Sequence, residues 1–252
     1  MPSTVSPAPD CRLLEEDPDL AETIPGARRA AAVERCVAST VRVPRGRWAI
    51  PGSMHLFDGI GLLVLEGLLL RRVGVDGRFG AEILGDGDLM RPRFDVPPMT
   101  SLSVTAGWRV LAPARLAVLD LDAARRFSEY PELTGAFVDR ALDRTRNLQI
   151  LMAIVHHARV NVRVHMLLWH LADRWGRVGS EGVVLPLAIT HSVLADMVAA
   201  RRPTVTSALS ELARMDLVRP VEGGWLLHGE RPGELEELTV PDVSERGGAA
   251  AA

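Results

Sequence analysis

The stretch ITHSVLADMVAARRPTVTSALSELARMDLV, residues 189–218, consists of two short amphipathic segments joined by small residues. Thr190 is a candidate N-cap for the first segment, and Leu194 with its apolar neighbours predicts one buried face. Ala199 lies in the junction between the segments. Pro203 suits the first turn of a second helix, because its missing N–H would have no intrahelical partner there. The pattern predicts a helix-turn-helix.

The second segment combines an apolar face with a cationic and hydroxylic one. Its predicted buried positions repeat at helical spacing and are Val205, Leu209 and Leu212. We expect Arg202 to contact a base edge, since arginine can bond bidentately to guanine in the major groove, and serine or threonine can reach bases or phosphates. Thr190 and His191 are expected to contact phosphate. The predicted DNA-contacting residues are Thr190, His191, Arg201, Arg202, Thr204, Thr206 and Ser207.

Two short apolar runs follow, over residues 218–221 and 225–227, separated by Glu222, Gly223 and Gly224. The two glycines are predicted to supply the positive φ that a hairpin turn requires. A strand, turn and strand at this place is typical of the wing of a winged helix. The alternative is an ordinary helical hairpin packed in a core. The turn, the basic helix start and the wing occur together and in order, which favours the DNA-reading interpretation.

Residues 189–218 resemble the helix-turn-helix of the Crp/Fnr transcription regulators. The positions that carry like residues are Ile189, Thr190, Leu194, Val198, Arg202, Thr204, Val205, Leu209, Leu212, Leu217 and Val218. The resemblance covers this whole motif and, more weakly, most of the chain from about Val43. It implies an α+β fold with an N-terminal cyclic-nucleotide-binding-like β-roll (a jelly roll), a long dimerisation helix and a C-terminal winged helix-turn-helix.

The chain departs from the family pattern at three positions of this motif. Ala199 stands where many members have glycine, so a non-glycine residue must tolerate or avoid positive φ at a cost of about 1 kcal/mol. Pro203 and Ser207 replace the Glu and Arg with which many members read bases. The operator is therefore expected to differ from the family's best-known one.

The N-terminal half agrees with the β-roll that the resemblance implies. Turns are predicted at Glu66-Gly67, Asp76-Gly77 and residues 85–88, between short apolar runs. The runs predicted as strands are 48–50, 61–65, 68–73, 81–84, 102–104 and 116–119, and helices are predicted over 26–39 and 119–127. Many short strands at this spacing are typical of a β-sandwich or jelly roll.

The β-roll lacks the features with which the family's cAMP readers hold their ligand. Those proteins use a Gly-Glu-Leu stretch and an Arg-Ser/Thr-Ala stretch, whereas residues 87–100 here read GDLMRPRFDVPPMT. Arg91 and Arg93 are candidate effector contacts for an anion, or else solvated loop arginines. On the dimerisation helix, residues 147–149 (Asn-Leu-Gln) replace the Thr/Ser pair that touches the base. We therefore predict no cofactor, and cyclic-nucleotide binding is disfavoured.

The family that this motif resembles also includes haem-sensing and iron–sulfur members. Haem sensors take ligands from about His55 and from the N-terminus, which would be Pro2 after removal of Met1, and this is too little to predict a haem. Cys11 and Cys36 are the only cysteines, and they cannot form a four-thiolate cluster. With no secretory signal ahead of them, a reduced, cytoplasmic state is expected in preference to a disulfide.

A long helix is predicted over residues 132–159, and a further one over 161–175. The apolar positions of the long helix follow a three-four alternation, which is typical of a two-stranded coiled coil. The predicted dimer-interface residues are Val138, Ala141, Thr145, Leu148, Met152 and Val155. The alternative is a helix buried wholly within one chain. Dimerisation is favoured because one such helix-turn-helix reads too few bases to be selective.

Composition indicates a globular protein, and the net charge does not by itself indicate nucleic-acid binding, whereas the distribution of charge along the chain does. The 252 residues are 47% hydrophobic, and the net charge is −3. Every basic residue is arginine. Residues 159–219 contain eight arginines and five acids, whereas residues 220–252 contain two arginines and seven acids. The positive charge is therefore concentrated in the predicted DNA-binding part, and no uncharged apolar run reaches the roughly 20 residues of a membrane span.

The sequence contains no recognisable catalytic motif. It has neither a Gly-x-x-x-x-Gly-Lys phosphate loop nor a Gly-x-Ser-x-Gly nucleophile turn. His156 and His157 are adjacent, and His165 and His170 lie about 140° apart around a helix, so neither pair has metal-ligand spacing on one helical face. We predict that the protein is not an enzyme and has no metal site.

These observations predict a cytoplasmic homodimer that binds double-stranded DNA and regulates transcription, with RNA polymerase as a further candidate partner and no membrane association. The alternative is a ligand-sensing or scaffolding dimer whose winged helix binds protein. A β-roll that senses nothing, with constitutive DNA binding, is also open. The expected boundaries are 1–12 for a flexible N-terminus, 13–128 for the β-roll with flanking helices, 129–160 for the dimerisation helix, 161–230 for the winged helix-turn-helix and 231–252 for a disordered tail.

Overall fold

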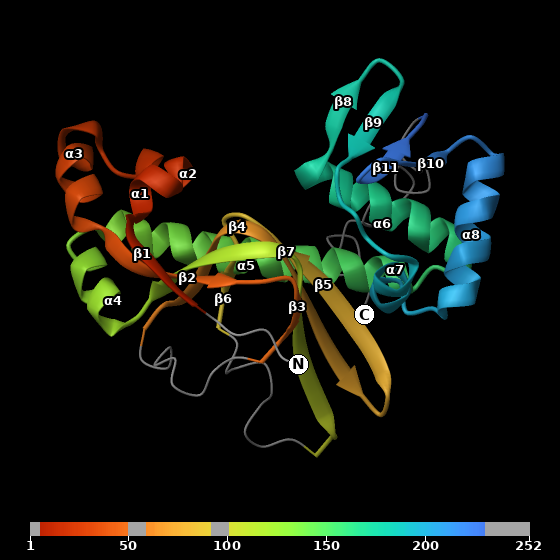
Figure 1. The fold of residues 1–252 in the computed structure, drawn as a ribbon, viewed down its shortest axis with the longest axis horizontal. Helices are drawn as coiled ribbons and strands as arrows, with labels where there is room; N and C mark the ends of the chain where they lie inside the picture. The colour runs from red at the N-terminus through yellow and green to blue at the C-terminus, as the bar shows by residue number, and fades with distance from the viewer. Residues whose placement is uncertain (1–5, 50–58, 92–100, 230–252) are drawn as a thin grey trace, which may run out of the picture. The chain divides into compact units, whose positions relative to one another are not determined.

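The computed structural model describes residues 6–49, 59–91 and 101–229 (Figure 1). The chain divides into two compact units. The first comprises residues 1–156 together with 189–202, and the second comprises residues 157–188 together with 203–252. The predictions for Pro2, His55, Arg93 and the tail over 231–252 lie outside the described residues.

The first unit is built on an antiparallel sheet of seven strands in the order β1-β2-β7-β4-β5, with β3 paired to β7 and β6 to β4 (Figure 1). Two long strands, β4 (Gly61–Val75) and β7 (Val104–Leu119), pair along most of their length. The other strands are β1 (Ser6–Arg12), β2 (Val37–Val43), β3 (Gly46–Trp48), β5 (Arg78–Leu84) and β6 (Leu89–Met90). The predicted α+β fold with an N-terminal β-roll is confirmed.

The predicted turn at Glu66-Gly67 is wrong, because β4 runs through it as one strand. The pairing with β7 shifts register between Val64 and Glu66 and again before Leu69, so this place is a bulge. Gly67 has φ +106°, and a Cβ there would clash with the carbonyl oxygen of Pro113. The glycine thus bends a continuing strand against its neighbour. The strand predicted over 116–119 is likewise part of the single strand β7, and of the strand predicted over 102–104 only Val104 belongs to it.

The N-terminal segment is more regular than predicted. Residues 6–12, expected to be flexible, form β1 and pair with β2. Short helices follow, α1 (Leu13–Glu16), α2 (Pro18–Glu22) and α3 (Gly26–Arg35). The helix predicted over 26–39 ends at Arg35, because the residues from Val37 onward pair as β2 with both β1 and β7. Inter-strand hydrogen bonds therefore outweigh the local helical pattern of this segment.

Two apolar clusters form the core of the first unit. One lies beneath α1–α3 and contains Leu13, Leu20 and Phe127, whose ring stacks on that of Phe137 at 6.3 Å between centroids. The other lies between the strands and includes Trp48, whose ring meets that of Trp108 edge-on. Burial on this scale is the main stabilising contribution to the unit.

Two helices follow the sheet, α4 (Leu121–Phe127) and α5 (Pro131–Val155). Asp120 caps α4 by accepting a hydrogen bond of 2.9 Å from the Ala123 N–H, as its acidic side chain favours. Arg140 of α5 donates to both carboxylate oxygens of the buried Asp17, at 2.6 and 2.7 Å. This bidentate pair ties α5 to the N-terminal helices.

The second unit is a small α+β assembly. A four-stranded sheet in the order β10-β11-β9-β8 combines β8 (Arg177–Gly179), β9 (Gly182–Leu185), β10 (Val218–Val221) and β11 (Gly224–Leu227). The helix α6 (Val160–Trp175) packs against β9. Residues 176–182, predicted as a loop, contain β8, which is paired to β9 by a tight turn. Within the described ranges, no helix is both long and apolar enough to cross a membrane.

Candidate nucleic-acid interface

The first helix of the predicted motif is α7 (His191–Met197), which belongs to the first unit and packs there against β5. Thr190 is its N-cap, and the Thr190 hydroxyl oxygen accepts a hydrogen bond of 3.4 Å from the Val193 N–H. Leu194 and Met197 are buried, while His191 is half-buried. The predicted cap and apolar face are confirmed.

Ala199 follows α7 with φ +51°, the left-handed conformation that glycine adopts more easily. The next residue, Ala200, donates its N–H to the Ala195 carbonyl at 2.9 Å, which closes the end of the helix. The backbone therefore keeps the geometry of a glycine turn without the glycine. The Ala199 Cβ makes this conformation unfavourable by about 1 kcal/mol.

The second helix, α8 (Arg202–Arg214), has the two faces that its periodicity predicts. The residues buried within the second unit are Val205, Ala208, Leu209 and Leu212. On the other face Thr204, Thr206 and Ser207 are exposed, and Ser207 donates its hydroxyl to the Pro203 carbonyl at 3.3 Å. This bond leaves the lone pairs of the Ser207 hydroxyl able to accept a further hydrogen bond.

Two exposed arginines, Arg201 and Arg202, precede these hydroxyl groups. Their charges lie at the N-terminal end of α8, where the helix dipole also favours an anion. Thr190, His191, Arg201 and Arg202 lie in the first unit, and Thr204, Thr206 and Ser207 lie in the second. Each predicted DNA-contacting residue is therefore exposed or half-buried in its own unit. That these residues contact DNA together stays a prediction.

The hairpin of β10 and β11 forms the wing, with Val221 paired to Gly224 across a turn. Gly223 has φ +74°, as predicted, but Gly224 is not in a positive-φ conformation. A Cβ at Gly224 would instead clash with the carbonyl oxygen of Leu185, because β11 lies close to the backbone of β9 there. The second glycine is therefore required by strand packing and not by the turn.

The turn that connects α8 to the wing was not predicted from the sequence. Asp216 has φ +57°, and its carboxylate accepts two hydrogen bonds from Arg219, at 2.9 and 2.8 Å. The hydrogen bonds from Arg219 lower the pKa of the Asp216 carboxyl. The signal in the sequence is an Asp three residues before an Arg at the start of a predicted strand. This exposed pair orients the Arg219 side chain on the wing.

The predicted effector residues are only partly described. Arg91 is exposed and donates to the Gly59 carbonyl at 2.9 Å. Residues 147 and 149 on α5 are also exposed. Arg91 thus bonds a backbone carbonyl of its own unit, and its contact with an anion stays a prediction.

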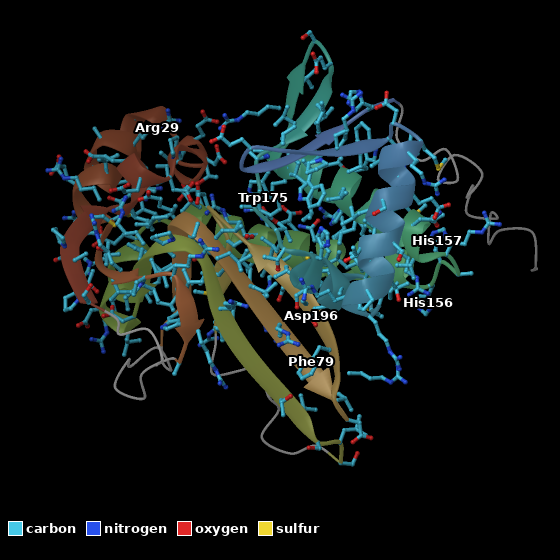
Figure 2. The ribbon with its side chains drawn as sticks, turned by 45° about the vertical axis from the view of Figure 1, so that its right-hand side comes forward. Arg29, Phe79, His156, His157, Trp175 and Asp196 are labelled. Carbon is cyan, nitrogen blue, oxygen red and sulfur yellow. The ribbon has the colours of Figure 1, made fainter. Side chains whose placement is uncertain are left out.

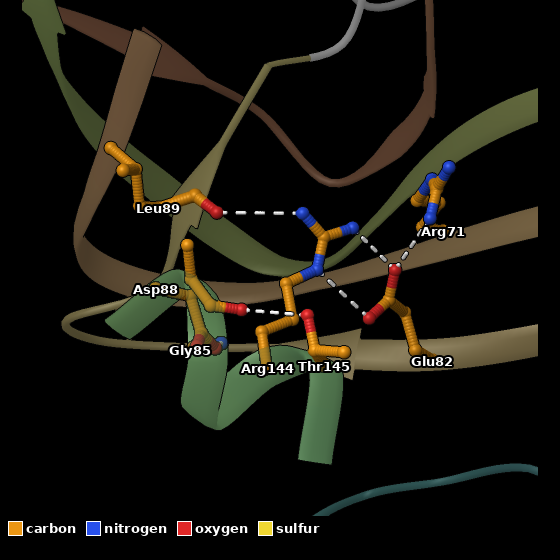
Figure 3. A network of polar contacts seen from close by, with 8 residues as sticks. Arg71, Glu82, Gly85, Asp88, Leu89, Arg144 and Thr145 are labelled. Atoms are coloured by element: carbon orange, nitrogen blue, oxygen red, sulfur yellow. Dashed lines mark hydrogen bonds and ion pairs between the residues drawn. The ribbon is translucent and has the colours of Figure 1, made fainter. Parts of the chain in front are cut away.

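A buried ion-pair cluster, which the sequence analysis missed, joins the sheet to α5 (Figure 3). Glu82 on β5 is 6% exposed and accepts hydrogen bonds from Arg71 at 2.9 Å and from Arg144 at 3.1 Å. Burial alone raises the pKa of Glu82, but the hydrogen bonds and charges of Arg144 and Arg71 outweigh it and hold the pKa below its ordinary value. The only sequence signal is an acid in an otherwise apolar strand.

The predicted dimer seam lies along the accessible side of α5. Val138 is 53% exposed and Met152 is 62% exposed, although both are large apolar side chains. Ala141 and Thr145 are exposed, whereas Leu148 and Val155 are half-buried. Leu142, which was not among the predicted residues, is 55% exposed beside them. The helix therefore presents apolar side chains that are exposed among the described residues of its own chain.

The histidines do not form a metal centre among the residues that the structure describes, where no group of three or more His, Cys, Asp or Glu could hold an ion. His156 ends α5 and His157 follows it (Figure 2). His165 is buried in α6 and accepts a hydrogen bond from Trp169, and burial lowers its pKa.

Comparison with known proteins identifies the type of architecture. Residues 162–238 match the Crp-like helix-turn-helix domain family. Comparison with curated protein sequences finds no match. A cyclic nucleotide-binding domain containing protein from Listeria monocytogenes EGD-e has a similar structure, with 15% identity and a TM-score of 0.62 over 83% of this chain and 96% of that one.

Two further solved structures are similar over most of both chains. FixK2 from Bradyrhizobium japonicum is 16% identical, with a TM-score of 0.57 over 85% of this chain and 99% of that one. A CooA mutant from Carboxydothermus hydrogenoformans is 16% identical, with a TM-score of 0.58 over 79% of this chain and 86% of that one. Residues 162–238 therefore belong to the Crp-like helix-turn-helix domain family, and the chain as a whole shares the fold of these solved structures.

Proposed function

We propose that this protein is a sequence-specific DNA-binding transcription regulator that places α8 in the major groove. The observation that carries the proposal is the surface of α8, where Thr204, Thr206 and Ser207 are exposed directly after Arg201 and Arg202. The arginines are suited to guanine and phosphate, and the hydroxyl groups to bases or phosphates. The match of residues 162–238 to a Crp-like helix-turn-helix domain supports this assignment.

The regulator acts as a homodimer on a near-palindromic operator. The exposed apolar stripe of α5, with Val138, Leu142 and Met152, supports a partner helix along that side. A two-fold dimer would set two copies of α8 about 34 Å apart, one turn of DNA. Such a protein works in the cytoplasm with RNA polymerase and carries out no catalysis itself.

The β-roll of this regulator is proposed to be degenerate as a cAMP sensor, or tuned to another effector. Glu82 of β5 accepts hydrogen bonds from Arg71 and from Arg144 of α5, so among the described residues these two arginines already face a carboxylate of the protein itself. DNA binding is therefore expected to be the same with and without cAMP. A requirement for cAMP would contradict this part of the proposal.

A salt-titrated binding assay of the full chain against DNA from its own promoter region tests the function. Phosphate contacts make log affinity fall steeply with log salt, whereas a protein-binding winged helix would show weak, unselective DNA binding at every salt concentration. Arg202→Ala should weaken binding to the selected site by about 1–3 kcal/mol. Arg214→Ala, at the other end of α8, is the matched control and should change affinity little. Equal effects of the two substitutions would argue against Arg202 as a base contact.

A further inference from the structure

Two serines lie on the exposed face of α8, close to one turn apart along the helix. Ser207 and Ser210 are both exposed, whereas Ala208 and Leu209 between them are buried. Residues three positions apart share one side of a helix, so the two hydroxyl groups lie together on the side that faces away from the core of the second unit. What each hydroxyl can offer a partner depends on where its single proton is directed.

Each of these hydroxyl groups donates its proton to the helix itself. The Ser207 Oγ donates to the Pro203 carbonyl at 3.3 Å, and the Ser210 Oγ donates to the Thr206 carbonyl at 3.0 Å. A backbone carbonyl can only accept, and a serine hydroxyl has one proton, so both protons are used within α8. The outward side of each hydroxyl therefore offers lone pairs alone.

A group that can only accept is selective among the surfaces of DNA. Phosphate oxygens are acceptors, and so are the polar major-groove atoms of guanine and of thymine. The donors in the major groove are the exocyclic amino groups of adenine and cytosine. To bond a phosphate, a guanine or a thymine, either serine would have to give up its bond within the helix, whereas an amino group leaves that bond intact.

We propose that Ser207 and Ser210 are specificity-determining residues that accept hydrogen bonds from base amino groups, so that each meets an adenine or a cytosine in the half-site. This inference rests on the proposed function, since it requires α8 to enter the major groove. The role differs from that of Arg202, because a guanidinium has only donors and suits guanine. Phosphate is removed from the contacts expected of Ser207, and Ser210 joins the residues expected to contact DNA.

Alanine substitutions delete these hydroxyl groups without disturbing the helix. Ser207→Ala and Ser210→Ala remove an acceptor from an exposed position, and alanine has the higher helix propensity, so both variants should fold. Ser180→Ala is the matched control, because Ser180 is exposed in the turn between β8 and β9 and lies outside α8. Thermal melting checks that all three variants are folded.

The test begins with sites that the full wild-type chain selects from random-sequence duplex DNA. Each adenine of the selected half-site is then replaced by purine and each cytosine by pyrimidin-2-one, one position at a time, and these analogues lack the exocyclic amino group. Every altered site is titrated against the wild type and the three serine variants. The analogues also weaken base pairing, but this effect is common to all four proteins and cancels in a double-mutant comparison.

One altered position should weaken binding of the wild type roughly fivefold and binding of Ser207→Ala by less than about twofold, and a second position should do the same for Ser210→Ala. Ser180→Ala should respond to every altered site as the wild type does. Affinity for random-sequence DNA should be equal in Ser207→Ala and the wild type, since losing a phosphate contact weakens binding to all sequences and losing a base contact does not.

Each serine is judged separately. A serine that shows no coupling to any amino group would not have the proposed role, and neither would one whose alanine variant binds random-sequence DNA as poorly as it binds the selected site. Both results leave the proposed function intact, because selective binding by the wild type is still present. If the selection returns no preferred sequence, the proposed function fails, and the inference fails with it.

Discussion

The indole Nε1 of Trp169 donates a hydrogen bond of 3.0 Å to Nε2 of His165, one turn earlier in α6. Both side chains are buried, so the imidazole must be neutral, with its other nitrogen protonated, to accept this bond. Burial lowers the pKa of His165, and burial also lowers the pKa of His170, against a smaller opposing effect of Asp173. The winged domain therefore depends on two uncharged histidines.

Acidification should destabilise this domain. The pKa of each histidine is lower in the folded state than in the unfolded chain, where it is 6.5. As the pH falls, the unfolded chain therefore binds protons at a higher pH than the folded chain does. The contribution of the two neutral histidines to the free energy of unfolding is fully present above about pH 6.5 and is lost as the pH decreases below it. Urea unfolding of the winged domain, followed between pH 7.5 and 5.5 by Trp fluorescence, would measure the fall.

The matched variant for this prediction is His165→Leu. It should lower stability at pH 7.5 by about 1–3 kcal/mol, since the buried Trp169 N–H loses its acceptor. Its pH dependence should be shallower than that of the wild type, because one titrating group is gone. An equally steep dependence would show that His165 is not one of the groups responsible.

Ala199→Gly should stabilise the protein. The residue has φ +51°, which glycine adopts without the Cβ penalty, and the expected gain is up to about 1 kcal/mol. Ala200→Gly is the control, because Ala200 is not in a positive-φ conformation and should lose stability through greater freedom of the unfolded chain. Urea midpoints measure both, and a loss of stability in Ala199→Gly would contradict the strain argument.

Glu82→Gln should destabilise the β-roll by about 3–5 kcal/mol, because Arg71 and Arg144 would keep their charges in a largely buried place without the carboxylate. Glu15→Gln removes one of the two exposed partners of Arg12, the other being Glu34, and should change stability by less than about 1 kcal/mol. Thermal unfolding of both variants checks the difference. If Glu82→Gln lowered the stability as little as Glu15→Gln does, the charges of the buried cluster would contribute little to stability beyond side-chain packing.

The two cysteines should be unreactive in the folded protein. Burial raises the pKa of Cys36 to about 11, and burial also raises the pKa of Cys11, so little reactive thiolate is present at pH 8. Titration with a disulfide reagent should detect almost no thiol in the native protein and both thiols in denaturant. Rapid native reaction of either cysteine would contradict their buried placement.

The helix-turn-helix could be predicted because its signals are local. The cap at Thr190, the spacing of the apolar residues in α8 and the hairpin after Val218 each depend on neighbours a few residues away. The long helix α5 and its exposed stripe follow from the same kind of periodicity. These features required no knowledge of distant contacts.

Features that depend on distant neighbours were misjudged or missed. Gly67 resembles a turn residue, but its role as a bulge is decided by the backbone of β7 beside it. Residues 6–12 have a proline-rich, coil-like composition, yet they become a strand because β2 offers an unpaired edge. The role of Gly224 is likewise decided by the carbonyl of Leu185.

By itself, the sequence determined the elements with a local period and the Crp/Fnr resemblance, and it predicts which residues contact DNA. Only the tertiary structure decided that Glu82 meets Arg71 and Arg144, and that Arg72 pairs with Asp196. The physical reason is sequence separation. Capping and amphipathic spacing act within one or two turns, whereas an ion pair between residues 62 or 124 positions apart exists only once the chain has folded.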